Sequence, residues 1–213
     1  PVLFFAKGNT MLLRKPCKFI SVIGSRKISD YAARVGTRLA HILADKEYVI
    51  VGGLATGSDT CGHKGAMESG YTLAVMPCGL DMVVPSENIG LFLQMIDNGS
   101  LAISEYPIGH APTKATYVER DRLQAGIADG LIVLETSEDG GTMHAVRKAA
   151  ELHRPIGCLS PDIVEQPGNQ MLIDQYGAVT INTQDDIDAF VKSLPKREHS
   201  IKGSILVEQS KLF

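Results

Sequence analysis

The chain has 213 residues and a formal net charge of −3, with 44% hydrophobic and 21% charged residues. This size and composition allow a full buried core without a disulfide or metal staple, and no apolar run approaches the roughly 20 residues that a membrane helix requires. No charged-then-apolar leader precedes Phe4, and the four cysteines lie far apart without metal-ligand spacing, so we expect a cytoplasmic protein without a membrane segment.

Short apolar runs alternate with segments of helical periodicity along almost the whole chain. This alternation predicts an α/β fold of Rossmann-like type, a doubly wound, mostly parallel sheet with helices on both faces. The predicted strands are 19–23, 48–51, 72–76, 101–104, 131–134 and 156–159, with a shorter one at 179–181. The predicted helices are 30–45, 59–69, 87–97, 118–127, 142–152, 169–176 and 184–194.

The sequence shows no internal repeat and no second domain. We expect one domain over residues 1–194 and a tail over 195–213. The tail is polar and charged at 196–204, which favours a partly ordered terminus. The alternative is that apolar residues 205–207 dock onto a protein partner.

The first predicted strand ends in Gly24-Ser25-Arg26, just before a helix that Ser29 or Asp30 can cap. Backbone N–H groups at such a turn favour anions, and a glycine lets a ligand approach the backbone. Two further glycine turns, 52–57 and 140–142, follow the second and fifth predicted strands. Because ligands of open α/β sheets bind outside the carboxyl ends of the strands, these turns predict an anion-binding rim.

The glycine turns do not match the common nucleotide-binding motifs. None has the spacing of the dinucleotide fingerprint, and the chain contains no P-loop, so we expect no cofactor. No serine lies in G-x-S-x-G, and Cys78 has no evident histidine partner. Asp59 and His63 share one face of a predicted helix, where a structural role is favoured over catalysis or metal binding.

The charge is unevenly spread along the chain. Residues 1–64 carry 10 Lys or Arg against 4 Asp or Glu, whereas residues 65–113 carry none against 5. With Lys114, Arg120 and Arg122, the first third predicts a basic face that attracts phosphate, and scattered solvated charge is the alternative. Tyr117 lies among these cations, a pattern typical of single-stranded nucleic-acid binding, unless Glu119 and Asp121 pair with the arginines.

Taken in order, these motifs resemble the Rossmann-like core of the DNA-processing protein A (DprA/Smf) family. The resemblance spans roughly residues 3–182 and covers that core only. Its landmarks in this chain are Lys7-Gly8-Asn9, Val22-Ile23-Gly24-Ser25-Arg26, the segment 53–60 with His63 and Gly65-Ala66, Gly79-Leu80-Asp81 with Pro85 and Asn88, Ser104-Glu105-Tyr106-Pro107 with Gly109, Arg120-Asp121-Arg122 with Ala125-Gly126, and Gly140-Gly141-Thr142 before Ala145, Ala149 and Glu151.

The resemblance implies a protein that is not an enzyme, forms a homodimer, binds single-stranded DNA and helps to load a RecA-type recombinase onto it during natural transformation. It also implies which residues contact the DNA backbone and bases. These are Gly24, Ser25, Arg26, Gly53, Lys114, Tyr117, Arg120 and Thr142.

The chain departs from the family pattern where the charge matters. The usual Arg-Asn-Arg is here Arg120-Asp121-Arg122, and Val118 followed by Glu119 replaces the proline that often follows the aromatic residue. Because added negative charge weakens a phosphate site, a second hypothesis stays open. It is an enzyme or sensor for a small nucleotide, related to the cytokinin-activating phosphoribohydrolases, whose pocket carboxylate would be Glu105, Glu135 or Asp59.

Overall fold

The structure, a computed structural model, describes residues 3–14 and 17–195. Within these residues one eight-stranded sheet has the order β1-β5-β4-β3-β2-β6-β7-β8. Only β1, at one edge, is antiparallel to its neighbour, so the prediction of a doubly wound, mostly parallel sheet is confirmed. The strands are β1 (Phe5–Gly8), β2 (Lys18–Ile23), β3 (Tyr48–Gly52), β4 (Thr72–Met76), β5 (Leu101–Ser104), β6 (Gly130–Val133), β7 (Ile156–Leu159) and β8 (Val179–Ile181).

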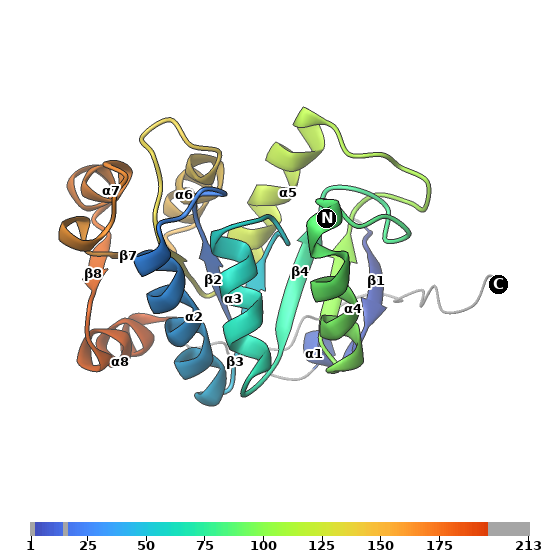
Figure 1. Cartoon of the computed structure of the whole chain (residues 1–213), viewed down its shortest axis with the longest axis horizontal. Helices are drawn as coiled ribbons and strands as arrows, with labels where there is room; N and C mark the ends of the chain where they lie inside the picture. The colour runs from blue at the N-terminus through green and yellow to red at the C-terminus, as the bar shows by residue number, and fades with distance from the viewer. Residues whose placement is uncertain (1–2, 15–16, 196–213) are drawn as a thin grey trace.

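Helices cover both faces of the sheet (Figure 1). They are α1 (Met11–Arg14), α2 (Asp30–Asp45), α3 (Ser58–Met67), α4 (Ile89–Asp97), α5 (Lys114–Ile127), α6 (Thr142–Glu151), α7 (Gly168–Tyr176) and α8 (Gln184–Ser193), with short 3₁₀ turns at Ser86–Asn88 and Pro161–Ile163. Helices α2, α3, α4 and α8 pack on one face, and α1, α5, α6 and α7 pack on the other. None of the helices in the described part of the chain is both long and apolar enough to cross a membrane.

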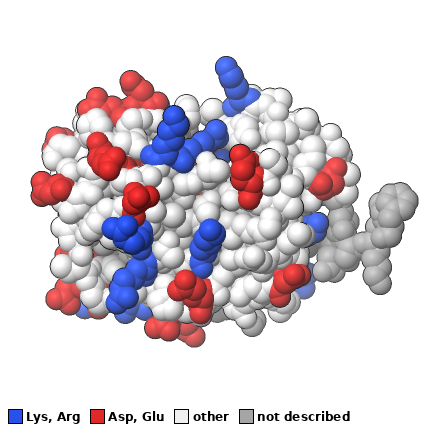
Figure 2. Space-filling view, viewed as in Figure 1, with Lys and Arg blue, Asp and Glu red and all other residues white. Residues whose placement is uncertain are grey.

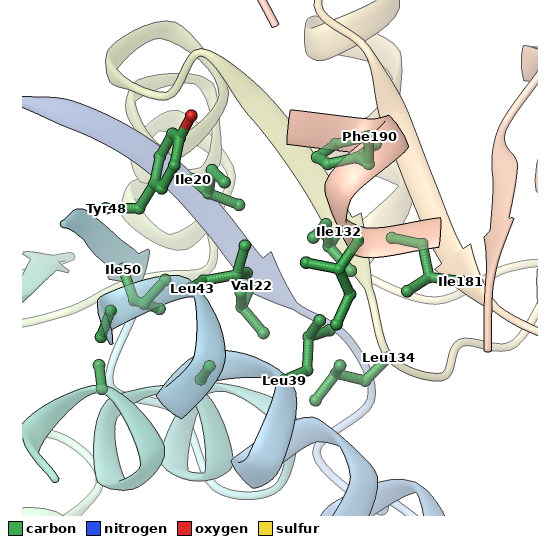
Figure 3. Close-up of a cluster of buried hydrophobic side chains, with 14 of the residues drawn as sticks. Ile20, Val22, Leu39, Leu43, Tyr48, Ile50, Ile132, Leu134, Ile181 and Phe190 are labelled. Carbon is green, nitrogen blue, oxygen red and sulfur yellow. The ribbon is translucent and has the colours of Figure 1, made fainter. Parts of the chain in front are cut away.

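The core lies in two layers because side chains of a strand point alternately to the two faces. On β2, Ile20 and Val22 pack under α2, whereas Phe19 faces the opposite layer. Figure 3 shows Ile20 and Val22 of β2 in one cluster with Leu39 and Leu43 of α2 and Phe190 of α8. A strand buried on both faces reads as a continuous apolar run, which is why the central strands were predictable.

The order of the strands places a crevice at one rim. Strand β2 lies between β3 and β6. The chain passes from β2 outward to β5 on one side, then crosses over to β6 on the other side. This reversal is the topological switch point, and ligands of open α/β sheets bind there, outside the carboxyl ends of the strands.

Three elements differ most from the sequence prediction. Strand β1 and helix α1 were not predicted, since each has four residues and β1 pairs only at the edge of the sheet. Helix α5 begins at Lys114 rather than at residue 118, because Thr113 and Thr116 form a reciprocal capping box. Apart from Pro195, the predicted tail lies outside the described residues, so the domain boundary at 194 stays a prediction.

Candidate functional site

A cavity of about 430 Å³ opens at the switch point, and we call it the rim cavity. Three segments form most of its wall: the loop after β2, one side of α5, and the loop from β6 with the start of α6. Ala55 and Asp59, from the β3–α3 segment, complete the lining. The lining residues are Ile23, Gly24, Ser25, Arg26, Ala55, Asp59, Tyr117, Val118, Arg120, Asp121, Gln124, Thr136, Ser137, Gly140, Gly141, Thr142, His144 and Ala145. The structure therefore brings six of the eight predicted contact residues to one cavity, all but Gly53 and Lys114.

The first wall is held by the backbone of the neighbouring strand end. The Ser25 N–H donates to the carbonyl of Glu135 at 2.6 Å. A Cβ on Gly24 would lie 2.6 Å from that same carbonyl oxygen and 2.5 Å from Ser58 Oγ, so no larger residue fits. The Ser25 hydroxyl donates to the Lys27 carbonyl at 2.9 Å. The Gly24-Ser25 turn is thereby fixed, and Arg26 next to it is exposed.

Tyr117 of α5 lies close to two guanidinium groups. The Cζ of Arg26 is 5.2 Å from the Tyr117 ring centroid, and the Cζ of Arg120 is 5.9 Å from it. Both distances are within the range of cation–π attraction. Arg26 faces solvent at the mouth of the cavity, whereas Arg120 is 5% exposed. The free positive charge at the mouth therefore belongs to Arg26.

Arg120 is neutralised inside the protein. Its Nε lies 3.1 Å from Asp121 Oδ1, and its Nη1 lies 4.0 Å from Asp59 Oδ2. Nη1 also donates to the carbonyl of Val75 at 3.3 Å. A Cβ on Gly53 would overlap this guanidinium. Arg120 thus supports the Tyr117 ring from within the core.

Asp121 is the acidic side chain on the α5 wall. Burial raises the pKa of Asp121 to about 6, with the Arg120 charge acting in the opposite direction and the Asp59 charge adding to the rise. Its side chain is 16% exposed. Asp121 therefore presents a carboxyl group to the cavity whose charge changes near neutral pH.

The β3–α3 loop is held inward by side chains of α3. The Gly53 and Ala55 N–H groups donate to Asp59 Oδ2 at 2.7 and 3.3 Å, and the Leu54 N–H donates to His63 Nε2 at 3.3 Å. His63 Nδ1 lies 2.6 Å from Thr72 Oγ1, and burial lowers the pKa of His63 to about 3, so the ring is neutral. The favoured structural role of this pair agrees with the contacts. The Gly53 N–H, predicted to face a ligand, is already bonded to the Asp59 side chain.

The third wall is the start of α6. Gly141 stands at the N-cap position without a side-chain cap, and Thr142 follows as the first helical residue. The next two N–H groups, of Met143 and His144, donate to the carbonyls of Gly140 and Gly141 at 3.0 and 3.1 Å. The N-terminus of a helix carries partial positive charge, so this wall attracts anions. Lys114 does not line the cavity, but it lies on the first turn of α5, one turn before Tyr117 and exposed.

The carboxylates that a nucleotide-cleaving site would need are engaged within the protein. Glu135 is fully buried and accepts from the N–H groups of Ser29, Glu165 and Gln166 at 2.8, 2.7 and 3.0 Å. Glu105 accepts two bonds from Arg122. Asp59 holds the β3–α3 loop, as described above. No group of His, Cys, Asp or Glu among the described residues is arranged to hold a metal ion.

The predicted basic face is only partly formed. Arg120 is buried and Arg122 is paired with Glu105, so neither adds free charge. Glu119 accepts from the Tyr106 hydroxyl at 2.5 Å and does not line the cavity. Figure 2 shows basic and acidic side chains interspersed over most of the face that carries α2, α3 and α4.

Sequence reasoning missed Gln124, Ser137 and His144 in the cavity wall. Gln124 follows Tyr117 by seven residues, two helical turns, so helical spacing identifies it once α5 is known to begin at Lys114. His144 is the third residue of α6. The place of His144 near the start of a helix was predictable from the sequence. That the start of α6 faces α5 across one cavity could be seen only in the fold.

The sequence profile of the DNA recombination-mediator protein A family matches residues 1–192. The chain is 35% identical over 193 residues to DNA processing protein DprA of Streptococcus pneumoniae, and 30% identical over 190 residues to Protein Smf of Synechocystis. These alignments cover 89% and 88% of this chain, but 67% and 47% of the relatives. The chain therefore spans about half to two thirds of the length of these relatives.

Solved structures give the same result. A structure of DNA processing protein A from Helicobacter pylori, concerned with the unique single-stranded DNA binding mode of that protein, superposes with a TM-score of 0.81 at 28% identity, covering 90% of this chain and 88% of that one. The X-ray structure of the S. pneumoniae protein gives 0.79 at 35% identity, covering 89% and 66%. Both superpositions cover about nine tenths of this chain.

Proposed function

The chain belongs to the DNA recombination-mediator protein A family, and from this we propose that its rim cavity binds single-stranded DNA. One observation carries the proposal: exposed Arg26 stacks over Tyr117 at the mouth of a cavity whose far wall is the start of α6. A phosphate and a neighbouring base are the ligand that matches a cation, a ring face and helix amides together.

Each wall has a separate role in this proposal. Arg26 and the α6 amides near Thr142 neutralise phosphates, while Gly24 and Ser25 let the backbone approach closely. Tyr117 stacks a base, and Lys114 extends the cationic edge by one turn of α5.

Arg120 and Gly53 act differently from the other predicted contacts. Arg120 is buried against Asp59 and Asp121, and the Gly53 amide is bonded to Asp59. We assign both a positioning role, in which they fix the ring of Tyr117 and the β3–α3 loop.

The test is binding of fluorescent oligothymidylate measured across salt concentration. Arg26→Ala and Lys114→Ala each remove a phosphate contact, so affinity should fall by about tenfold for Arg26→Ala and the slope of log K against log salt should decrease by about 0.7 per contact. The matched control is Arg14→Ala on α1, since Arg14 is exposed and α1 precedes the amino end of β2, at the opposite rim. Undetectable binding at low salt, or equal affinity of all four proteins, contradicts the proposal.

A binding role rather than catalysis is part of the proposal. The candidate carboxylates Glu135, Glu105 and Asp59 are bonded within the protein, which leaves Asp121 as the carboxyl group on the α5 wall. Incubation with nucleoside monophosphates should release no free base. Release of a base would support the small-nucleotide hypothesis instead.

We further propose the partners and setting that family membership suggests: a homodimer that delivers bound DNA to a RecA-type recombinase during natural transformation in the cytoplasm. Cys61, Cys78 and Cys158 form no disulfide, which fits a reducing compartment. Sedimentation of the chain tests the dimer, and co-precipitation with a RecA-type recombinase in the presence and absence of oligonucleotide tests the partner.

A further inference from the structure

A second hollow lies on the outer surface between α2 and α3. It has a volume of about 540 Å³, and we call it the α2–α3 groove. Figure 2 shows Lys and Arg side chains gathered over α2, with another over α3. The residues that line the groove are Ala33, Arg34, Thr37, Arg38, His41, Thr60, Cys61, Lys64 and Glu68.

The cations of the groove are not balanced by the acid beside them. Arg34, Arg38 and Lys64 are exposed, and no described acidic side chain lies within ion-pair distance of any of them. Glu68, the acidic residue of the lining, faces His41 at 3.4 Å. The groove therefore favours an anionic ligand.

An aromatic ring stands in line with these cations. Tyr31, Arg34 and Arg38 recur at helical spacing on one side of α2, and the Arg34 Cζ lies 5.9 Å from the Tyr31 ring centroid. Tyr31 is 47% exposed. A solvent-facing ring beside arginines can stack on a base. An acidic peptide would need only the positive charges, so the ring favours a nucleic-acid strand.

The groove adjoins the rim cavity across one short loop. Thr60 of the groove donates to the carbonyl of Ala55, which lines the rim cavity, at 2.8 Å. The Ser58 N–H donates to the Ser25 carbonyl at 3.1 Å. Lys27, the residue after Arg26, is exposed.

We propose that the α2–α3 groove is a second phosphodiester-binding site, which takes the part of a single DNA strand that leaves the rim cavity over Lys27. This inference rests on the proposed function, because the strand is held first at Arg26 and Tyr117. Arg34, Arg38 and Lys64 neutralise its phosphates, and Tyr31 stacks a base near the entrance.

The test compares a short and a long oligothymidylate, of roughly 4 and 16 nucleotides, the range that single-strand sites cover. The double variant Arg34→Gln/Arg38→Gln should bind the short strand as the wild type does, and the long strand about tenfold more weakly, with a salt slope reduced by about 1.4 for two lost contacts. The control Arg147→Gln/Lys192→Gln removes the same charge from exposed positions on α6 and α8. Photo-crosslinking of iodouridine in the long strand should label Tyr31.

The outcomes separate the two proposals. If the wild type binds neither strand, the proposed function fails and the groove proposal fails with it. If the wild type binds both strands but the double variant matches the wild type on the long one, only the groove proposal is overturned. If the double variant binds both strands more weakly to the same degree, or if the control variant weakens binding as well, the groove proposal is also overturned. A general effect of positive charge, rather than a local site, then explains the loss of affinity.

Discussion

Asp121 decides how much negative charge faces a strand in the rim cavity. Its carboxyl group shares its surroundings with Arg120, Asp59, His144 and Arg26, and burial raises its pKa to about 6. An asparagine stands at this place in the usual family motif, so this chain carries a titratable group where that motif has a neutral amide.

We predict that the affinity for single-stranded DNA rises as the pH falls from about 7 to about 5, because protonated Asp121 no longer repels phosphate. Asp121→Asn should bind on the order of tenfold more tightly at neutral pH, the equivalent of about 1.4 kcal/mol. The affinity of this variant should also depend much less on pH. Anisotropy titrations at constant salt provide the measurement.

His144→Gln is the control for this prediction, since His144 lines the same cavity and its charge acts on the carboxyl group of Asp121. If His144→Gln removes the pH dependence and Asp121→Asn leaves it intact, the assignment to Asp121 is wrong.

Stability should report on the same carboxyl group without DNA. The pKa of Asp121 in the folded protein, about 6, lies above its ordinary value of 3.8, so the unfolded chain releases the proton first as the pH rises. The folded state therefore loses stability between about pH 4 and about pH 6, by at most about 3 kcal/mol from this group. In urea titrations, Asp121→Asn should lack this decline, and an identical decline in both proteins would contradict the assignment.

At the scale of elements, helix α5 carries the part of the site that depends most on one local motif. Thr113 accepts from the Thr116 N–H at 3.2 Å, and the Thr116 hydroxyl accepts from the Thr113 N–H at 2.9 Å. This box sets the first turn, which holds Lys114, and the next residue after that turn is Tyr117.

Thr113→Ala should lower the free energy of unfolding by about 1 kcal/mol and fray that first turn. Because fraying displaces Lys114 and Tyr117, affinity for single-stranded DNA should fall as well. Thr183→Ala is the matched control, since Thr183 and Asp186 form the same box at the start of α8. It should lower stability equally and leave affinity unchanged. Equal loss of affinity in both variants would show that the cap acts on overall stability alone.

Prediction from the sequence succeeded where one local signal sufficed. The β2 run ending at Gly24 and the Ser29 cap of α2 were recognisable because burial on both faces and a side-chain cap leave direct marks in the sequence. The alternative that Asp121 pairs with an arginine holds for Arg120. Its further partners Asp59 and Val75 were not recognisable, since they come from segments far away in the chain. Charge counts reveal which residues are ionised, but only the fold decides which of them remain exposed.

At the scale of the whole molecule, the position of β2 between β3 and β6 determines which segments meet at the rim. It brings the β2 loop, α5 and the start of α6 to one cavity, while α2 and α3, on the other face, form the adjoining groove. A small nucleotide would fill only the first of these hollows. In our proposal, an extended strand engages the cavity mouth and reaches beyond it.

Ligand-induced thermal stabilisation should therefore distinguish the two ligand classes. Oligothymidylate at about 100 times its Kd should stabilise the folded state by about 2.7 kcal/mol, which for a chain of this size raises Tm by roughly 5–11 °C. Nucleoside monophosphates at the same concentration should give no measurable shift, because they contact one phosphate site and little else. Arg26→Ala should keep the Tm of the free protein and lose about half of the shift, since Arg26 is exposed, its removal leaves the core intact and its affinity is about tenfold lower. A monophosphate that stabilises the protein more than the oligonucleotide does would favour the small-nucleotide hypothesis, because a linked strand can only add contacts to those of its single unit.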